Sequence, residues 1–167
     1  MRAISHMARM LSVFLLFLTA ASPLDHAATA QAGPSPRIVV IVAADSTLRD
    51  VSHALLKRIF LGEPAEHDGV RLVPLNYGPD DPLRIAFDRL ALGLSPEAAG
   101  RYWVDRRIRG QGLPPRAVPT QSLVRAVVAR LRGSIGYITP DQLDPSVRAL
   151  TIDGAHYTDP TYQLSIK

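Results

Sequence analysis

Hydroxyl side chains that follow a buried strand are the first residues in this sequence with the chemistry of a binding site. Ser46 and Thr47 come directly after the apolar, β-branched run 37–43, at the point where a strand of this kind ends. Open α/β folds bind ligands beyond the carboxyl ends of their strands, and hydroxyl groups can donate hydrogen bonds to an anion. We therefore take Ser46 and Thr47 as candidate ligand-binding residues. The alternative is that they form a simple turn or a helix cap.

Two further polar residues are candidates for contact with a ligand. Arg84 lies one turn into a helix predicted to begin at Pro82, where its guanidinium can face a ligand. The alternative is an exposed partner for one of three nearby carboxylates, Asp80, Asp81 or Asp88. Ser134 lies in the turn before Gly136 and Tyr137, and its hydroxyl can donate to a ligand. The alternative there is that the glycines shape the turn and Tyr137 packs in the core.

Residue types that carry catalysis and metal binding are sparse. The chain has no cysteine, which excludes thiolate nucleophiles and thiolate metal sites. The three histidines after residue 30 lack the spacing of metal ligands; they are His53, His67 and His156. A triad of Ser46, His53 and Asp50 is not supported, because the G-x-S-x-G pattern of a nucleophile elbow is absent. We predict a protein that is not an enzyme, with no metal site and no cofactor.

The first thirty residues have the three-part pattern of a secretory signal peptide. Arg2 and Arg9 precede the uncharged apolar run 10–21, and residues 28–30 (ATA) provide an A-x-A cleavage site. At ~1.5 Å per residue this run spans roughly 18 Å as a helix, too short for a bilayer core of ~30 Å. We predict cleavage near Ala30, periplasmic localisation and no stable membrane insertion after cleavage. The alternative is a short N-terminal anchor that is never cut.

The remaining chain is predicted to hold one domain. Residues 31–36 are predicted to be a linker, 37–153 the α/β domain and 154–167 a polar C-terminal tail. The whole chain has 19 Lys and Arg against 15 Asp and Glu. Setting aside Arg2, Arg9 and Asp25 leaves 17 against 14, too mild an excess to predict nucleic-acid binding. One basic patch stands out, and it consists of Arg101, Arg106, Arg107, Arg109 and Arg116. We interpret it as a solvated helix end. The alternatives are contact with a phosphate, an anionic lipid or an acidic partner.

Predicted strands and helices alternate along this domain. Strands are expected over 37–43, 70–75, 135–139 and 147–152, and helices over 52–61, 82–92, 95–107 and 121–131. Asp81 followed by Pro82 is a typical helix start, because the carboxylate caps free N–H groups and proline fits the first helical position. The alternation favours an α/β domain with a mostly parallel sheet flanked by helices.

Four segments together resemble the phosphate-specific periplasmic binding proteins. They follow in the family's order over residues 37–152: residues 59–62 (IFLG), Trp103, residues 110–112 (GQG) and residues 133–138 (GSIGYI). The resemblance implies one lobe of a type 2 periplasmic-binding-protein-like fold. It also implies an exported solute-binding module that holds phosphate or another small oxyanion without chemistry. An anionic solute and an ABC permease are the partners that this function implies.

The sequence departs from that family in its length and in one loop. The chain has about half the length of a two-lobed member and matches chiefly the second lobe. In the phosphate binders, the loop after the second strand supplies hydroxyls and N–H groups to the anion. The matching residues here, 76–82, contain no Ser or Thr, and Asp80 and Asp81 place negative charge at a helix start, where an anion needs positive potential. The alternative function is a non-transport periplasmic interaction or scaffold protein that has lost the anion site. Such a protein would bind a protein partner or a second copy of itself.

Overall fold

The computed structural model describes residues 37–166. The predicted signal peptide, its cleavage site and the linker lie outside these residues. Chain order gives fifteen elements over the described residues: β1 (Val39–Ala43), β2 (Asp50–Val51), α1 (His53–Phe60), β3 (Glu66–His67), β4 (Val70–Arg71), β5 (Val73–Asn76), α2 (Pro82–Phe87), η1 (Asp88–Leu92), α3 (Pro96–Ile108), β6 (Arg116–Ala117), α4 (Gln121–Arg130), β7 (Ser134–Ile138), η2 (Pro140–Gln142), β8 (Val147–Ala149) and β9 (Thr151–Ile152). Here η1 is a π-helical turn and η2 a 3-10 turn. Within this part of the chain, no helix has both the length and the apolar character needed to cross a membrane.

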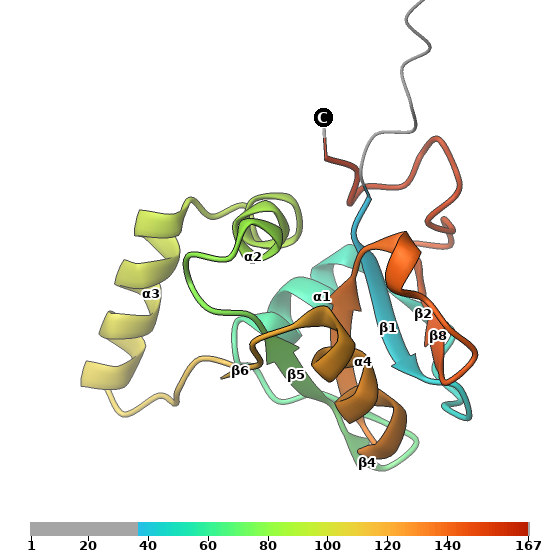
Figure 1. Cartoon of the computed structure of the whole chain (residues 1–167). Helices are drawn as coiled ribbons and strands as arrows, with labels where there is room; N and C mark the ends of the chain where they lie inside the picture. The colour runs from blue at the N-terminus through green and yellow to red at the C-terminus, as the bar shows by residue number, and fades with distance from the viewer. Residues whose placement is uncertain (1–36, 167) are drawn as a thin grey trace, which may run out of the picture. The chain divides into compact units, whose positions relative to one another are not determined.

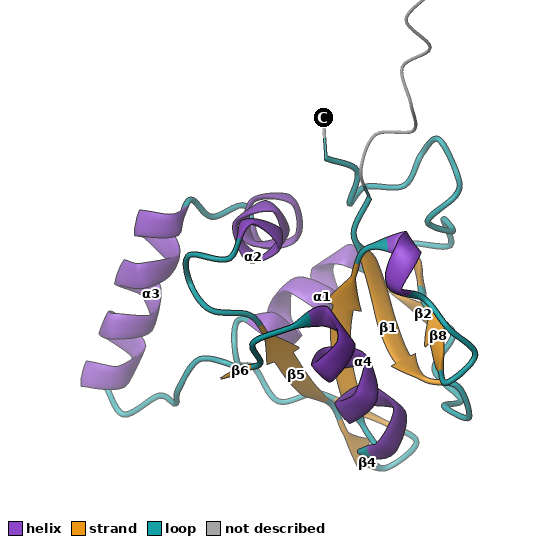
Figure 2. Ribbon diagram, in the orientation of Figure 1, coloured by secondary structure: helices purple, strands orange, loops and turns teal. Residues whose placement is uncertain are grey.

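Five strands form one sheet in the order β6-β5-β7-β1-β8, with helices on both of its sides (Figure 2). The predicted α/β class is therefore confirmed. The sheet is mixed rather than mostly parallel: β5 runs parallel to β6 and β7, whereas β1 runs antiparallel to both β7 and β8. The alternation of strands and helices in a sequence does not specify which strands become neighbours. Here β7 inserts between β1 and β5, and its direction sets the mixed pattern.

The helices begin where the sequence predicts them. Ser52, Asp81, Ser95 and Thr120 each accept a backbone N–H at the start of a helix, from α1 to α4 in turn. Such caps satisfy N–H groups that have no partner within the helix. Two predicted strands are divided. The N–H of Leu72 donates to the carbonyl of Ala65 (2.8 Å) between β4 and β5, and the predicted strand 147–152 becomes β8, which pairs with β1, and β9, which pairs with β2.

The core lies between the sheet and the helices on its two sides (Figure 1). All five residues of β1 and all five of β7 are buried. A Cβ placed on Gly136 of β7 would lie 2.7 Å from Val124 Cγ1 of α4, so only glycine permits this close packing. Phe60 of α1 packs against Phe87 of α2, whose ring stacks on Tyr137 of β7. These contacts pack β7 against α4 through Gly136 and against α1 and α2 through Tyr137.

The C-terminal segment packs against the start of β1. Tyr162 and Leu164 are buried, the Ile38 N–H donates to the Leu164 carbonyl (2.9 Å) and the Tyr162 hydroxyl donates to the Ile38 carbonyl (2.9 Å). Residues predicted only as a polar tail therefore contribute apolar surface to the core.

Candidate functional site

A pocket of about 350 Å³ lies where β1 ends and β7 begins. Because the two strands are antiparallel neighbours, the C-terminal end of β1 lies beside the N-terminal end of β7. The turn of the β3–β4 hairpin and the end of α4 complete the walls. We call this the Ser134 pocket, and its polar lining consists of Asp45, Ser46, Thr47, His67, Asp68, Arg130, Arg132 and Ser134.

Ser134 supplies a buried hydroxyl that has no partner. The residue is 2 % exposed, and its Oγ makes no hydrogen bond with any described residue. Its backbone is nonetheless fixed, since its N–H donates to the Leu131 carbonyl (3.0 Å). The preceding Gly133 has a φ of 82°, and a Cβ there would lie 2.3 Å from the Arg71 carbonyl oxygen. Leaving a buried hydroxyl unpaired costs about 1–3 kcal/mol, a cost that a ligand in the pocket would remove.

Ser46 and Thr47 approach the pocket from the loop after β1. Ser46 Oγ accepts the Leu48 N–H (3.2 Å), which is the turn role that the sequence allowed, and its hydroxyl hydrogen has no acceptor among the described residues. Thr47 Oγ1 donates to Asp68 Oδ2 (2.5 Å), and His67 Nε2 lies 3.1 Å from the same Oγ1. Thr47 thereby ties the loop after β1 to the β3–β4 turn and fixes the width of the pocket.

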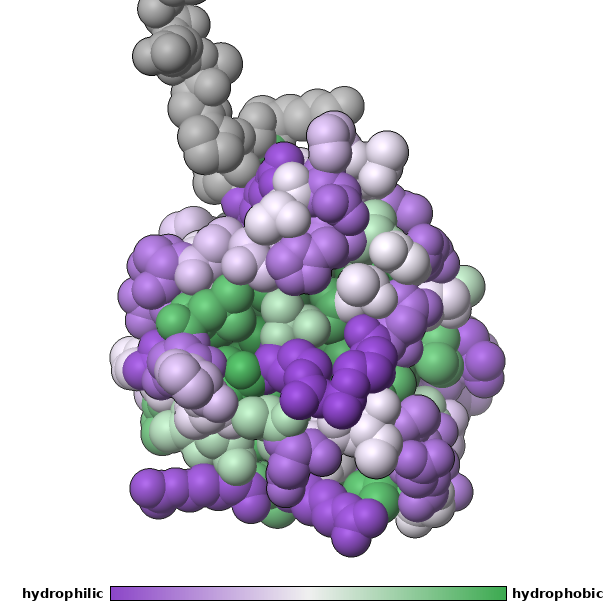
Figure 3. All heavy atoms as spheres, turned by 90° about the vertical axis from the view of Figure 1, so that its right-hand side faces the viewer, coloured by the Kyte–Doolittle hydropathy of each residue, from purple (hydrophilic) through white to green (hydrophobic). Residues whose placement is uncertain are grey.

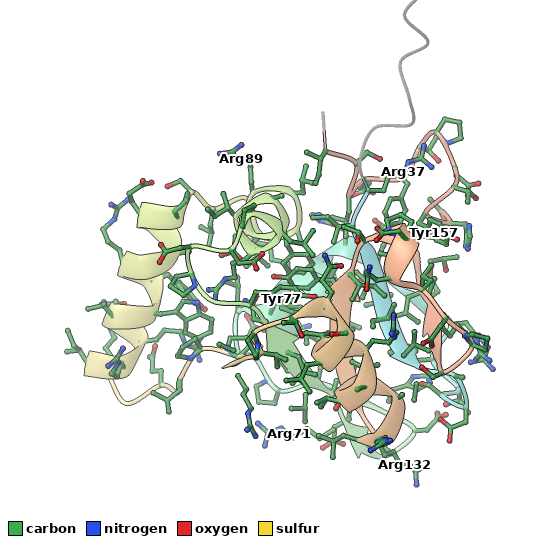
Figure 4. All side chains as sticks on the ribbon, in the orientation of Figure 1. Arg37, Arg71, Tyr77, Arg89, Arg132 and Tyr157 are labelled. Carbon is green, nitrogen blue, oxygen red and sulfur yellow. The ribbon has the colours of Figure 1, made fainter. Side chains whose placement is uncertain are left out.

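Two arginines bring positive charge to the pocket. Arg130 ends α4 and Arg132 follows it, both are exposed, and neither guanidinium has an ion-pair partner within residues 37–166. Figure 4 shows Arg132 at the same end of the molecule as Arg71 and away from Tyr77. Two carboxylates, Asp45 and Asp68, also line the pocket. Sequence reasoning did not identify these charged residues, because a basic residue at a helix C-terminus is already explained by the helix dipole.

The C-terminal end of β5, away from the Ser134 pocket, carries a second group of polar side chains, which bond mainly to one another. Among their buried polar atoms, Asp88 Oδ1 has no partner within the described residues. The Tyr77 hydroxyl donates to the Tyr137 carbonyl (2.6 Å), and the Tyr137 hydroxyl donates to Asn76 Oδ1. Arg84 Nε donates to Asp88 Oδ2 (3.0 Å) and Arg84 Nη1 to the Tyr77 carbonyl (2.9 Å). We call these five residues the buried polar cluster: Asn76, Tyr77, Arg84, Asp88 and Tyr137, each 7 % exposed or less.

Arg84 is therefore neither exposed nor part of the pocket. It is 7 % exposed, and its partner is Asp88, one of the carboxylates considered from the sequence. The positions i and i+4 share one face of the helix, and this face carries Phe87 into the core. Burial raises the pKa of the Asp88 carboxyl, and the Arg84 guanidinium offsets only part of that effect. Of the four candidate residues, three surround the Ser134 pocket and Arg84 lies in the buried polar cluster.

Residues 76–82, which the sequence resemblance matches to the anion-binding loop of the phosphate binders, lead into a helix in this chain. Asp81 Oδ1 accepts the N–H groups of Leu83 (2.8 Å) and Arg84 (3.3 Å), which confirms its predicted role as a helix cap. A carboxylate therefore occupies the position at the start of α2 where an anion would need free N–H groups.

Two other hollows are also lined by polar residues but lack, among the described residues, a buried polar atom without a partner. One, of about 600 Å³, lies between the α2–η1 region and the C-terminal segment, and the other, of about 560 Å³, lies over β8. Figure 3 views the molecule from the side of β8, where apolar and hydrophilic residues alternate over the surface. Residues 37–166 also contain no group of three His, Asp or Glu side chains that could hold a metal ion.

No protein-family model matches the sequence, and no curated protein matches it. Solved structures do match. A protein from Clostridium perfringens described as a phosphate ABC transporter substrate-binding protein, with bound phosphate, aligns with a TM-score of 0.61 and 18 % identity over 75 % of this chain and 48 % of its own. An ABC-type phosphate transport receptor from Vibrio cholerae aligns with a TM-score of 0.63 and 16 % identity, over 79 % of this chain and 54 % of its own.

A third match has the same extent. PstS from Borrelia burgdorferi aligns with a TM-score of 0.60 and 13 % identity, over 78 % of this chain and 55 % of its own. At these identities the likeness concerns the fold. The chain spans about half the length of the structures it matches, and it is structurally similar to one lobe of the phosphate ABC transporter substrate-binding proteins.

Proposed function

We propose that this chain is a binding module without catalytic activity, which holds phosphate or another small oxyanion in the Ser134 pocket. The observation that carries the proposal is the Ser134 hydroxyl, which is buried at the pocket wall and has no partner. The similarity to proteins described as phosphate-binding adds support at the level of the fold.

The pocket offers the groups that an oxyanion needs. The Ser134 and Ser46 hydroxyls donate to its oxygen atoms, while the Arg130 and Arg132 guanidiniums balance its charge. Thr47 holds Asp68 by a hydrogen bond and so limits the approach of that carboxylate to the ligand. The volume of about 350 Å³ leaves room for the anion together with water molecules that bridge it to the walls.

Isothermal titration of the purified protein with inorganic phosphate, sulfate and nitrate tests the proposal. We expect saturable heat with phosphate or sulfate and a rise in the thermal midpoint at the same concentrations, because a ligand that binds only the folded state stabilises it. If none of the three anions gives heat or a midpoint shift at millimolar concentration, the pocket does not bind such an ion.

A pair of serine variants identifies the site. Ser134→Ala removes the proposed donor, and we expect affinity to fall roughly ten-fold or more, since a hydrogen bond to a charged group contributes ~1.5–3 kcal/mol. Ser122→Ala is the matched control, because Ser122 is exposed on α4, away from the pocket lining, and its hydroxyl forms a hydrogen bond with Thr120. Equal affinity in both variants would place any bound anion elsewhere.

The proposal includes export and delivery of the solute to an ABC permease. The N-terminal pattern of residues 1–30 supports export, and the fold is one that solute-binding proteins of such transporters share. Sequencing the N-terminus of protein recovered from the periplasm is expected to read from Gln31. Recovery of uncut protein that begins at Met1 in the cytoplasmic fraction would contradict this.

A second candidate function is a periplasmic interaction or scaffold protein without an anion site. The observation that favours it is the closed end of β5, where Asp81 caps α2 and the buried polar cluster fills the space behind it. This function predicts no anion heat in the titration and a cross-linked species, either a dimer or a complex with another protein, when intact cells are treated with a cross-linker.

A further inference from the structure

The C-terminal end of α3 and the loop after it expose large apolar side chains. Six such residues are exposed among those described, and three of them lie here: Val104 (52 % exposed), Ile108 (79 %) and Leu113 (70 %). Val104 and Ile108 are one helical turn apart and so share a face of α3. Leu113 follows in the loop 109–115. We call this segment, residues 100–116, the α3 tip.

The opposite face of α3 anchors this segment to the domain. Trp103 packs over Gly62, where a Cβ would lie 3.2 Å from the indole ring, and the Tyr102 hydroxyl donates to the Leu61 carbonyl (2.8 Å). Arg106 donates to the Tyr102 hydroxyl (3.0 Å) and to the Gln111 carbonyl (2.6 Å), which fixes the loop against the helix. The apolar side chains are therefore presented by an ordered element rather than by a loose chain end. Figure 1 shows α3 beside the sheet and not on it.

The same segment is strongly basic. Residues 100–116 contain five arginines and a single acidic residue, Asp105. Asp105 pairs with Arg109 (3.0 Å), and Arg106 is used in the contacts described above. Three exposed arginines of this segment have no ion-pair partner within residues 37–166: Arg101, Arg107 and Arg116. Arg101 and Arg107 lie on α3, as Val104 and Ile108 do. Arg116 begins β6, directly after the loop that holds Leu113.

Exposed apolar groups among arginines fit an anionic lipid surface better than an acidic peptide. Peptides are usually held in grooves, and none of the three hollows described above is lined by a residue of the α3 tip. A headgroup layer adapts to a protruding surface. It accepts apolar side chains at the acyl boundary, and an anionic headgroup layer attracts Lys and Arg side chains near its surface.

We propose that the α3 tip docks this protein on an anionic membrane surface, with Ile108 and Leu113 entering the headgroup layer and the free arginines contacting lipid phosphates. Such docking is peripheral, so it is compatible with the absence of a membrane-crossing helix among the described residues. It is independent of anion binding in the Ser134 pocket, which lies at the ends of β1 and β7.

Vesicle co-sedimentation of the full chain tests the proposal, with phosphatidylcholine vesicles compared with vesicles that also contain phosphatidylglycerol. We expect binding at least ~10-fold tighter to the anionic vesicles at low salt, weakening as salt rises. Two variants should lower binding to anionic vesicles close to the level of neutral vesicles. The first is the triple variant Arg101→Gln, Arg107→Gln and Arg116→Gln. The second is the double variant Ile108→Asp and Leu113→Asp.

The matched control is Leu123→Asp with Leu131→Asp, which makes the same change at two exposed leucines on and after α4. All the proteins share residues 1–36, so a difference between variants reports the α3 tip alone. Binding unchanged in both α3-tip variants would overturn the proposal. A second outcome would also overturn it. If the arginine variant loses binding to anionic vesicles, Ile108→Asp with Leu113→Asp keeps it, and soluble polyglutamate competes with it, the partner is an acidic protein segment.

Discussion

The two ends of the central strands carry similar residue types in opposite states. At the end of β5, the buried polar cluster pairs both tyrosine hydroxyls, Asn76 Oδ1 and two nitrogens of Arg84 within the protein. Asp88 Oδ1 has no partner among the described residues, but Asp88 lines none of the three hollows. At the start of β7, the Ser134 pocket leaves a buried hydroxyl unpaired and two guanidiniums exposed. The difference shows that a polar residue near a strand end indicates a site only when its partners are not already supplied by the fold.

The two regions also differ in what holds them in place. The cluster depends on side chains, above all on Arg84, which joins α2 to the loop after β5. The pocket depends on backbone geometry, because Gly133 allows the chain to pass close to the Arg71 carbonyl before β7 begins. We therefore expect removal of the Arg84 charge to destabilise the buried polar cluster, and replacement of Gly133 to distort the Ser134 pocket.

Arg84→Met should give the largest loss of stability. It leaves Asp88 buried without a counter-charge, and breaking a buried pair in this way costs about 3–5 kcal/mol. Urea denaturation measures the change in the free energy of unfolding. Arg58→Met is the control, since the Arg58–Glu63 pair is largely exposed and its loss should cost less than ~1 kcal/mol.

The double variant Arg84→Met with Asp88→Leu sharpens this test. Replacing a whole buried pair by apolar side chains is often neutral, so we expect most of the lost stability to return. If the double variant is as unstable as Arg84→Met, the hydrogen bond from Arg84 to the Tyr77 carbonyl, rather than the charge of Asp88, dominates the cluster.

Gly133→Ala should have the next largest effect. The φ of 82° is unfavourable for alanine, and the new Cβ would collide with the Arg71 carbonyl, so we expect a loss of roughly 2–3 kcal/mol and weaker anion binding. Gly69→Ala separates the two causes, because Gly69 has a similar φ of 71° with no atom within 4 Å. Its expected cost is about 1 kcal/mol. Equal losses in the two variants would show that the collision is relieved by movement of β4.

Removing one hydroxyl from the buried polar cluster and one from the Ser134 pocket should change the free energy of unfolding by different amounts. Tyr137→Phe removes the hydrogen bond to Asn76 Oδ1, and we expect it to lower the free energy of unfolding by about 1 kcal/mol. Ser134→Ala removes a hydroxyl that has no partner, so stability should stay the same or rise slightly. Thermal denaturation without added anions measures both. A clear loss of stability in Ser134→Ala would mean that the hydroxyl already has a partner, such as a bound water.

The sequence predicts most of the elements because their signals are local. Caps such as Asp81 with Pro82, and the apolar runs that become β1 and β7, act within a few residues, so the α/β class and the helix positions follow from them. The mixed sheet could not be predicted in this way, because strand neighbours depend on contacts between distant residues such as Ile41 and Gly136.

The candidate site is only partly predictable for the same reason. Ser46, Thr47 and Ser134 are recognisable as hydroxyls next to strand ends, and the structure places all three around one pocket. Arg84 looks equally available in the sequence. Its burial depends on the face that α2 turns to the core, and Phe87 fixes that face. Arg132 gives no signal in the sequence, because its position is set by the packing of α4 on β7.

The smallest expected effect is a dependence of the free energy of unfolding on pH, which has opposite signs for buried Asp88 and exposed Asp144. Burial raises the pKa of Asp88, so the folded protein holds that proton more tightly than the unfolded chain. The stability from Asp88 is therefore fully present below the ordinary carboxyl pKa and is lost as pH rises through the raised value. Hydrogen bonds from Ser146 lower the pKa of exposed Asp144, so its stability is present above the ordinary pKa and is lost as pH falls.

Denaturation midpoints measured between about pH 3 and 7 separate these contributions when wild type is compared with Asp88→Asn and Asp144→Asn. Asp88→Asn should remove a decline in stability on the alkaline side of the ordinary carboxyl pKa, and Asp144→Asn should remove a decline on the acid side. If Asp88→Asn instead removes an acid-side decline, the Arg84 guanidinium outweighs burial.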